Sequence, residues 1–300
     1  MNDMFGNEIK AKAPNVLGDK FGAPPFSVLD AKQGWWSDRK RAWKRWGLKS
    51  DESREDIAVY DVKGYGKGYE SLPTVSVFDP VLTELMYSWF CPAGGKILDP
   101  FAGGSVRGVI AAEIGFSYWG CDLRPQQIYA NNNQKRELLP VEKQARVEWV
   151  CGDSVTEVKH APLCDMAFTC PPYGDLEVYS EDVKDLSTMP FDEFMGSFGV
   201  ILEETYKRLK DDSFAVIVVG DYRDKKTGIL RAFPAVTIAL AQAAGFDLYN
   251  SVMLLTPTGS AAMRASAQFS RGRKVVMVHQ RVLVFVKGDP KKAEAKILLK

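Results

Sequence analysis

The chain has 300 residues, 46% of them hydrophobic, and its 39 basic and 38 acidic side chains leave a formal net charge of +1. This composition is typical of a globular protein with a substantial core. No stretch approaches the roughly 18 consecutive apolar residues that a membrane-spanning helix needs, and the N-terminus lacks the apolar centre of a secretory signal. We therefore expect a cytoplasmic protein, in which any nucleic-acid partner must be bound by a local concentration of basic residues.

Cysteine and histidine usage argues against several kinds of site. The five cysteines stand singly, without a Cys-x-x-Cys pair, so neither a zinc ribbon nor a disulfide framework is indicated. The only histidines are His160 and His279, which makes a Ser-His-Asp triad or a histidine-rich metal site hard to build. We expect no bound metal.

The N-terminal region combines a glycine- and proline-bearing segment with a tryptophan-rich one. Residues 1–33 show little periodicity and are predicted to form an extended arm. Between residues 34 and 48, four tryptophans alternate with five basic side chains. The spacing of Trp36, Trp43 and Trp46 fits one helical face, with the cations on another. Such a helix could bind nucleic acid by stacking and phosphate contacts, but we favour packing of the tryptophans on the main domain.

Composition divides the chain into three parts. Residues 49–72 are charged and then rich in glycine and tyrosine, as expected for a linker. We therefore predict an N-terminal extension over residues 1–75, a catalytic domain over 76–289 and a basic tail over 290–300.

The catalytic domain shows an alternation of strand and helix patterns. It begins with a helix that Pro80 opens and Asp79 caps. Strands are predicted at 97–98, 118–122, 147–150, 166–169, 214–219, 248–255 and 281–286, and helices at about 105–114, 125–138, 191–209 and 232–244. This order predicts a three-layer, Rossmann-like α/β fold with a mostly parallel sheet and a β-hairpin of the last two strands.

Chemically active residues gather where these strands end. Ligands of open α/β sheets bind beyond the carboxyl ends of the strands, and those ends carry Asp99, Asp122, Asp153 and the tetrapeptide 170–173. Gly103 lets the turn after the first strand approach a ligand closely. Asp122 occupies the place, about 20 residues further on, of an acid that binds ribose hydroxyls. Because Asp99 would repel a pyrophosphate, the pattern predicts a nucleoside without phosphates.

The combination of Asp-Pro-Phe-Ala-Gly-Gly at 99–104, an acid at the end of the next strand and Cys-Pro-Pro-Tyr at 170–173 resembles the S-adenosylmethionine-dependent amino methyltransferases of DNA. Ser105 stands where the turn of that family has its last glycine. The tract over 78–90 looks like the family's additional cofactor motif, and several segments look like the stand-alone methylases of phages and prophages. The resemblance covers roughly residues 76–287.

This resemblance implies S-adenosylmethionine as cofactor and gives roles to six residues. The methionine part of the cofactor would lie against the first turn, its ribose against the acid of the second strand and its adenine against the end of the third. In that order, the implied residues are Asp99, Phe101 and Gly103, then Asp122, then Asp153 with Ser154.

The implied catalytic motif consists of Cys170, Pro171, Pro172 and Tyr173. In the family, the first residue and the carbonyl of the first proline accept hydrogen bonds from the target amino group, and the tyrosine stacks on a base flipped out of the duplex. Cys170 departs from the family, because a thiol is a weaker acceptor than Asp, Asn or Ser. We disfavour its alternative use as the nucleophile of cytosine C5 methylation, since that cysteine follows a proline and this one precedes two.

Basic side chains are concentrated between residues 256 and 281, where no acid occurs. We predict a DNA-recognition loop there, with the alternative of a merely solvated basic loop. Its predicted phosphate contacts are Arg264, Arg271, Arg273, Lys274 and Arg281.

The predicted function is methylation of adenine N6 or cytosine N4 in double-stranded DNA. One alternative is an RNA methyltransferase, because guanine N2 enzymes of tRNA carry a similar acid-Pro-Pro-Tyr-Gly tract and Gly174 follows Tyr173 here. The other alternative is a catalytically silent DNA-binding homologue, which only Cys170 supports.

Overall fold

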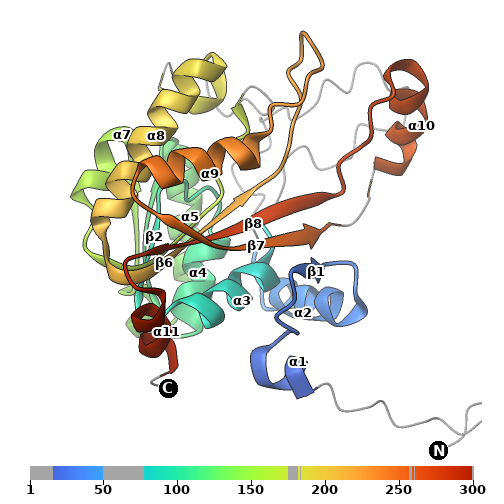
Figure 1. Ribbon diagram of the computed structural model, residues 1–300. Helices are drawn as coiled ribbons and strands as arrows, with labels where there is room; N and C mark the ends of the chain where they lie inside the picture. Colours follow the sequence, from blue (N-terminus) through green and yellow to red (C-terminus); the bar gives the residue numbers. More distant parts are fainter. Residues whose placement is uncertain are drawn as a thin grey trace, which may run out of the picture.

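The computed structural model describes residues 16–49, 78–174, 182, 184–256, 259 and 261–298. An eight-stranded sheet runs through the centre of this part, in the order β1-β7-β8-β6-β5-β2-β3-β4 (Figure 1). The strands are β1 (Val28–Asp30), β2 (Lys96–Asp99), β3 (Ser117–Asp122), β4 (Val147–Cys151), β5 (Cys164–Thr169), β6 (Leu209–Val219), β7 (Asp247–Leu255) and β8 (His279–Lys287).

One of these strands, β8, runs against its neighbours. It pairs antiparallel with β6 and β7, while the other strand pairings of the sheet are parallel. The predicted α/β fold with a mostly parallel sheet and an antiparallel C-terminal pair is confirmed. The pair is not joined by a tight turn, however, because helix α10 (Ala261–Gly272) lies in the connection.

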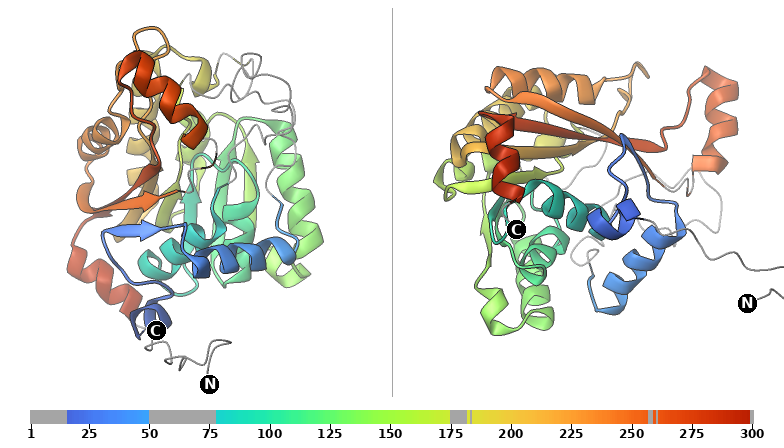
Figure 2. Two further views of the ribbon diagram at one scale, coloured as in Figure 1. Left: turned by 90° about the vertical axis from the view of Figure 1, so that its right-hand side faces the viewer. Right: turned by 60° about the horizontal axis from the view of Figure 1, so that its bottom comes forward.

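Helices cover both faces of the sheet, which confirms the three layers. One face carries α3 (Pro80–Phe90), α4 (Val106–Glu113) and α5 (Pro125–Leu138), and the other carries α8 (Phe191–Arg208) and α9 (Phe233–Ala243) (Figures 1 and 2). The remaining helices are α1 (Val16–Phe21), α2 (Gly34–Arg45), α6 (Val141–Gln144), α7 (Ser154–Glu157) and α11 (Pro290–Leu298), with short 3-10 turns η2 (Val158–His160) and η4 (Leu186–Thr188).

The protein has two hydrophobic cores, one on each face of the sheet. The alternation of side chains along the central strand β2 accounts for both. Adjacent residues of a strand point to opposite faces, so Ile97 packs in the core with α3 and α4, whereas Leu98 packs in the core with α8. Both side chains are fully buried. The short apolar strand thus needs helices on both sides, as the sequence order predicted.

The tryptophan-rich extension is part of this structure. Helix α2 packs on α3, and Trp36 is fully buried with its indole N–H donating to Asp79 Oδ1 at 3.1 Å. The favoured interpretation, packing rather than stacking on nucleic acid, is confirmed for Trp36. Within residues 16–33 the predicted extended arm is wrong, because α1 forms there and β1 adds a parallel edge strand beside β7.

Two further segments differ from their predictions. The predicted recognition loop over 256–281 contains α10, whose alanine-rich sequence favours a helix, and its last three residues already belong to β8. In the predicted basic tail, Pro290 opens α11, and Ala293 is buried against the core. From residue 50 on, the predicted linker lies outside the described residues.

The strand order creates a crevice at the centre of the sheet. From β2 the chain proceeds outward through β3 and β4, and then returns to place β5 and β6 on the other side of β2. At such a reversal, the connections leaving the two central strands diverge and leave room for a ligand at their carboxyl ends. In the described part of the chain, no helix has the length and apolar character to cross a membrane.

Candidate functional site

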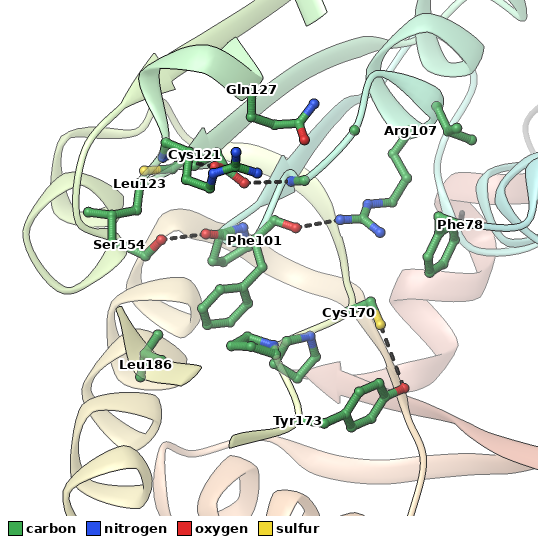
Figure 3. Close-up of a pocket in the computed structure, with 18 of the residues that line it drawn as sticks. Phe78, Phe101, Arg107, Cys121, Leu123, Gln127, Ser154, Cys170, Tyr173 and Leu186 are labelled. Atoms are coloured by element: carbon green, nitrogen blue, oxygen red, sulfur yellow. Dashed lines mark hydrogen bonds between the residues drawn. The ribbon is translucent and has the colours of Figure 1, made fainter. Parts of the chain in front are cut away.

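A cavity of about 340 Å³ lies at this crevice and brings together most of the residues selected from the sequence (Figure 3). Its volume falls within the range of small-molecule sites. Nine of the ten predicted cofactor-binding and catalytic residues line it, the exception being Asp99. The nine are Phe101, Gly103, Asp122, Asp153, Ser154, Cys170, Pro171, Pro172 and Tyr173.

Asp99 lies behind the cavity wall rather than in it. The side chain is fully buried. Its carboxylate accepts hydrogen bonds from the Tyr118 hydroxyl at 2.7 Å, the Thr169 hydroxyl at 2.7 Å and the Phe101 N–H at 3.2 Å. Asp99 at the end of β2 is therefore bonded to the beginning of β3 and the end of β5 and orients the turn, and the predicted direct contact with the cofactor does not fit this position.

Arg107 of α4 neutralises this buried carboxylate. Its Nε lies 2.6 Å from Asp99 Oδ2, and its Nη2 donates to the carbonyl oxygens of Phe101 and Ala102. Burial opposes the charge of Arg107, but the Asp99 carboxylate raises its pKa above the ordinary value, so the guanidinium stays charged. Arg107 was not among the residues predicted from the sequence, although its position in the first turn of the helix after a glycine turn places it beside the strand end.

Two backbone N–H groups of the first turn are already engaged by carboxylates. Gly103, whose φ is +52°, donates its N–H to Asp122 Oδ2 at 3.0 Å, and the N–H of Arg124 donates to Asp122 Oδ1 at 3.0 Å. The N–H of Phe101 is taken by Asp99. Phosphate cradles use such N–H groups for the ligand, whereas here two of them bind carboxylates of the protein. Of these two carboxylates only Asp122 lines the cavity, because Asp99 is buried and paired with Arg107, so the predicted repulsion of a pyrophosphate by Asp99 does not fit the structure.

The end of β4 completes the acidic side of the cavity. Asp153 caps α7 by accepting the N–H of Val155 at 2.9 Å, and the Ser154 hydroxyl donates to the Pro100 carbonyl oxygen at 2.5 Å. Ser154 thus ties this turn to the first one. Burial raises the pKa of Cys121, which also lines the cavity, to about 12, so this thiol is neutral at physiological pH.

The Tyr173 side chain is fixed by aromatic rings and hydrogen bonds. The centroid of its ring lies 6.3 Å from the ring centroid of Tyr222 and 6.0 Å from that of Phe233, and both ring pairs are T-shaped. Gln280 Nε2 donates to its hydroxyl at 2.7 Å, and Cys170 Sγ lies 3.9 Å from the same oxygen (Figure 3). A ring held in this way is preorganised to contact a planar ligand.

Gln280 could not be found from spacing alone. It lies near the beginning of the antiparallel strand β8, and this reversal brings the start of β8 to the edge where the parallel strands end. The cavity also receives Lys40 from α2 and Phe78 from the segment before α3. Phe78 belongs to the tract that resembles the family's additional cofactor motif, whereas Lys40 and Gln280 were not among the predicted site residues.

The five predicted DNA contacts lie on different elements. Arg264 and Arg271 belong to α10, Arg273 and Lys274 follow that helix, and Arg281 is a partly buried residue of β8. They therefore do not form one loop. Their contact with DNA stays a prediction.

The segment that carries α10 begins and ends at the cavity. Thr256 and Gln280 both line the cavity, and the Thr256 N–H donates to the Val278 carbonyl oxygen at 3.0 Å. Figure 1 shows α10 projecting beyond the ends of β7 and β8. The two ends of this segment are thus paired at the cavity, while no residue of α10 itself lines it.

No family model and no curated protein sequence matches this chain. Solved structures with a similar fold include TrmN from Thermus thermophilus, at 15% identity over 70% of this chain and 49% of that chain, with a TM-score of 0.47. A second one is the [4+2]-cyclase SpnF, at 14% identity over 70% of this chain and 82% of that chain, with a TM-score of 0.49. A third is a TehB-like SAM-dependent methyltransferase from Corynebacterium glutamicum, at 17% identity over 84% of this chain and 96% of that chain, with a TM-score of 0.43.

The chain spans about half the length of TrmN. At these identities the likeness concerns the fold alone. The function has to be argued from the residues of the cavity.

Proposed function

We propose that this protein transfers a methyl group from S-adenosylmethionine to an exocyclic amino group of double-stranded DNA, adenine N6 or cytosine N4. The observation that carries the proposal is the continuity of one cavity from the first turn, over residues 100–104, to the motif Cys170–Tyr173. A cofactor held at one end would lie next to a base held at the other. The basic segment at the rim, which includes α10, supports a polyanionic partner.

The residues at the acidic end of the cavity, which Asp122 and Asp153 line, fit S-adenosylmethionine. A positively charged ligand without phosphates suits a cavity end lined by Asp122 and Asp153. We assign the ribose to Asp122, the adenine to Asp153 and the methionine part to Phe101 and the Gly103 backbone. When bound, the cofactor supplies an electrophilic methyl group on sulfur. Asp99 acts as a positioning residue for the turn.

The other end of the cavity holds and orients the target base. An exocyclic amine is a poor nucleophile because its lone pair is delocalised into the ring. Cys170 and the carbonyl oxygen of Pro171 would accept hydrogen bonds from its two N–H groups, and Tyr173 would stack on the flipped base. Orientation and electrostatics then provide most of the acceleration.

Replacing Cys170 tests this role. We expect Cys170→Ala to lower the rate of methyl transfer by about tenfold, the value of one hydrogen bond, while Cys170→Ser, which keeps an acceptor, retains most of the rate. The measurement is single-turnover transfer at saturating cofactor. Equal rates for Cys170→Ala and the unmodified protein would place the acceptor elsewhere.

Replacing Asp122 tests the cofactor assignment. We expect Asp122→Ala to weaken S-adenosylmethionine binding by about tenfold or more, because hydrogen bonds to a charged group are the stronger ones. Asp165→Ala is the matched control. Asp165 lies near the start of β5, whereas the cavity lies at the carboxyl ends of the strands. Calorimetry of the two variants checks the prediction, and equal affinities would contradict it.

The substrate class is tested by incorporation of a labelled methyl group. Duplex DNA and tRNA are incubated separately with the protein and labelled S-adenosylmethionine. We expect label in duplex DNA and none in tRNA. Label in tRNA alone would favour the RNA alternative, and cofactor binding without label in either polymer would favour the silent homologue.

A further inference from the structure

We propose that α2 is a second DNA-binding element, and that Lys44 and Arg45 on its exposed side contact phosphates of the duplex whose base enters the cavity. The inference rests on the proposed function and extends it to a helix that the catalytic motifs do not include. It concerns the exposed basic residues of α2.

Helix α2 borders the cavity directly. Lys40 lines the cavity, and its Nζ lies 3.0 Å from Oδ2 of Asp79, which also lines it. Residues four positions apart share one side of a helix, so Lys44 continues the row of Lys40 outward from the rim. A basic side chain is thereby placed close to where DNA would have to lie.

Helix α2 is anchored to the domain by several side chains, which fixes the position of its exposed basic residues. Trp36 is fully buried and donates to Asp79, while Arg39 Nε donates to Glu84 Oε2 at 2.7 Å. The indole N–H of Trp43 donates to the same carboxylate oxygen at 3.2 Å. These partners belong to α3 and its N-cap, so α2 cannot turn its cations away without breaking these hydrogen bonds.

The exposed side of α2 carries excess positive charge. Residues 34–46 contain five basic residues and one acid. Arg39, Lys40 and Arg41 form ion pairs with Glu84, Asp79 and Asp38. Lys44 and Arg45 are exposed and form no ion pair with any other residue that the structure describes.

The two basic helices, α2 and α10, lie on the same edge of the molecule. The left view of Figure 2 looks at the edge toward which β7 points, with α10 in the upper part and α2 in the lower part. The cavity receives Lys40 from α2 and Thr256 and Gln280 from the two ends of the segment that carries α10. In a chain with a net charge of only +1, this arrangement concentrates cations where a duplex would cross the cavity.

The test compares two double variants that change the net charge equally. Lys44→Glu with Arg45→Glu alters α2, and Lys291→Glu with Lys292→Glu alters exposed residues of α11, which lies away from α2 and α10 (Figure 1). A long unmethylated DNA duplex is the probe, because binding to phosphates needs no particular target sequence.

We expect the α2 variant to bind the duplex at least roughly tenfold more weakly and with a shallower salt dependence, by about one unit of logarithmic slope for each phosphate that is no longer neutralised. The α11 variant should bind like the unmodified protein, and both should bind S-adenosylmethionine normally. Equal DNA binding by both variants, with methyl transfer to DNA intact, would overturn the inference and leave the proposed function standing. If the unmodified protein bound tRNA but not the DNA duplex, both the inference about α2 and the proposed function would be overturned.

Discussion

Tyr173→Ala is expected to lower methyl transfer to DNA by about 10- to 100-fold, the value of one base–aromatic stack, with little change in the affinity for S-adenosylmethionine. The reason is the position of the ring. It lies at the Cys170 end of the cavity, held by Tyr222 and Phe233, while the acidic groups assigned to the cofactor come from other strands. Single-turnover transfer and calorimetric cofactor binding, measured on the same preparation, check both parts.

Tyr173→Phe is the matched control. It keeps the ring but removes the hydroxyl that accepts from Gln280, so the rate should fall by no more than about tenfold, the value of a single hydrogen bond. If Tyr173→Ala weakened cofactor binding as much as methyl transfer, the separation of the cavity into a cofactor end and a base end would be wrong.

Arg107→Met is expected to lower the free energy of unfolding by about 3–5 kcal/mol, the typical cost of leaving a buried charge without its partner. Asp99 would remain fully buried, and the carbonyl oxygens of Phe101 and Ala102 would lose their donor. The loss of stability should appear in chemical denaturation as a lower midpoint with an unchanged slope.

Two variants bracket this prediction. Arg107→Lys keeps the positive charge but not the forked donor geometry, so its loss of stability should be intermediate. Arg136→Met, at an exposed position of α5, should change the free energy of unfolding by less than about 0.5 kcal/mol. A denaturation midpoint for Arg107→Met equal to that of Arg136→Met would show that the buried pair is not needed.

The fold could be predicted because its signals are local. The apolar strand around Ile97 and Leu98, the helix that Asp79 caps and the helix opened by Pro125 depend on short patterns, and the structure has each of them. Strands and helices alternate along the chain, and this order also requires helices on both faces of the sheet, which gives three layers. The predicted residues at the ends of β2, β3, β4 and β5 meet at one cavity for the same reason.

The position of Asp99 could not be predicted from such patterns. A carboxylate at a strand end binds a ligand or a protein group depending on which side chains face it. Here Arg107, Tyr118 and Thr169 face it, from three different elements. Only the assembled sheet shows that its hydrogen-bonding capacity is used inside the protein.

Interactions between distant segments account for the other differences. Edge strand β1 is three residues long and is stabilised by pairing with β7, so its sequence alone resembles an arm. In α2, burial of Trp36 and exposure of Lys44 depend on where α3 lies. The tryptophan pattern indicated a helix, but only packing separates its anchored side from its basic side.

Nucleoside mass spectrometry of DNA from cells that express the protein tests the proposed function most directly. Cells that express Tyr173→Ala at the same level serve as the control. We predict N6-methyladenine or N4-methylcytosine in the DNA of the first cells and much less of the same nucleoside in the second. Unchanged DNA nucleosides together with a new methylated nucleoside in the tRNA of the first cells would contradict the proposal.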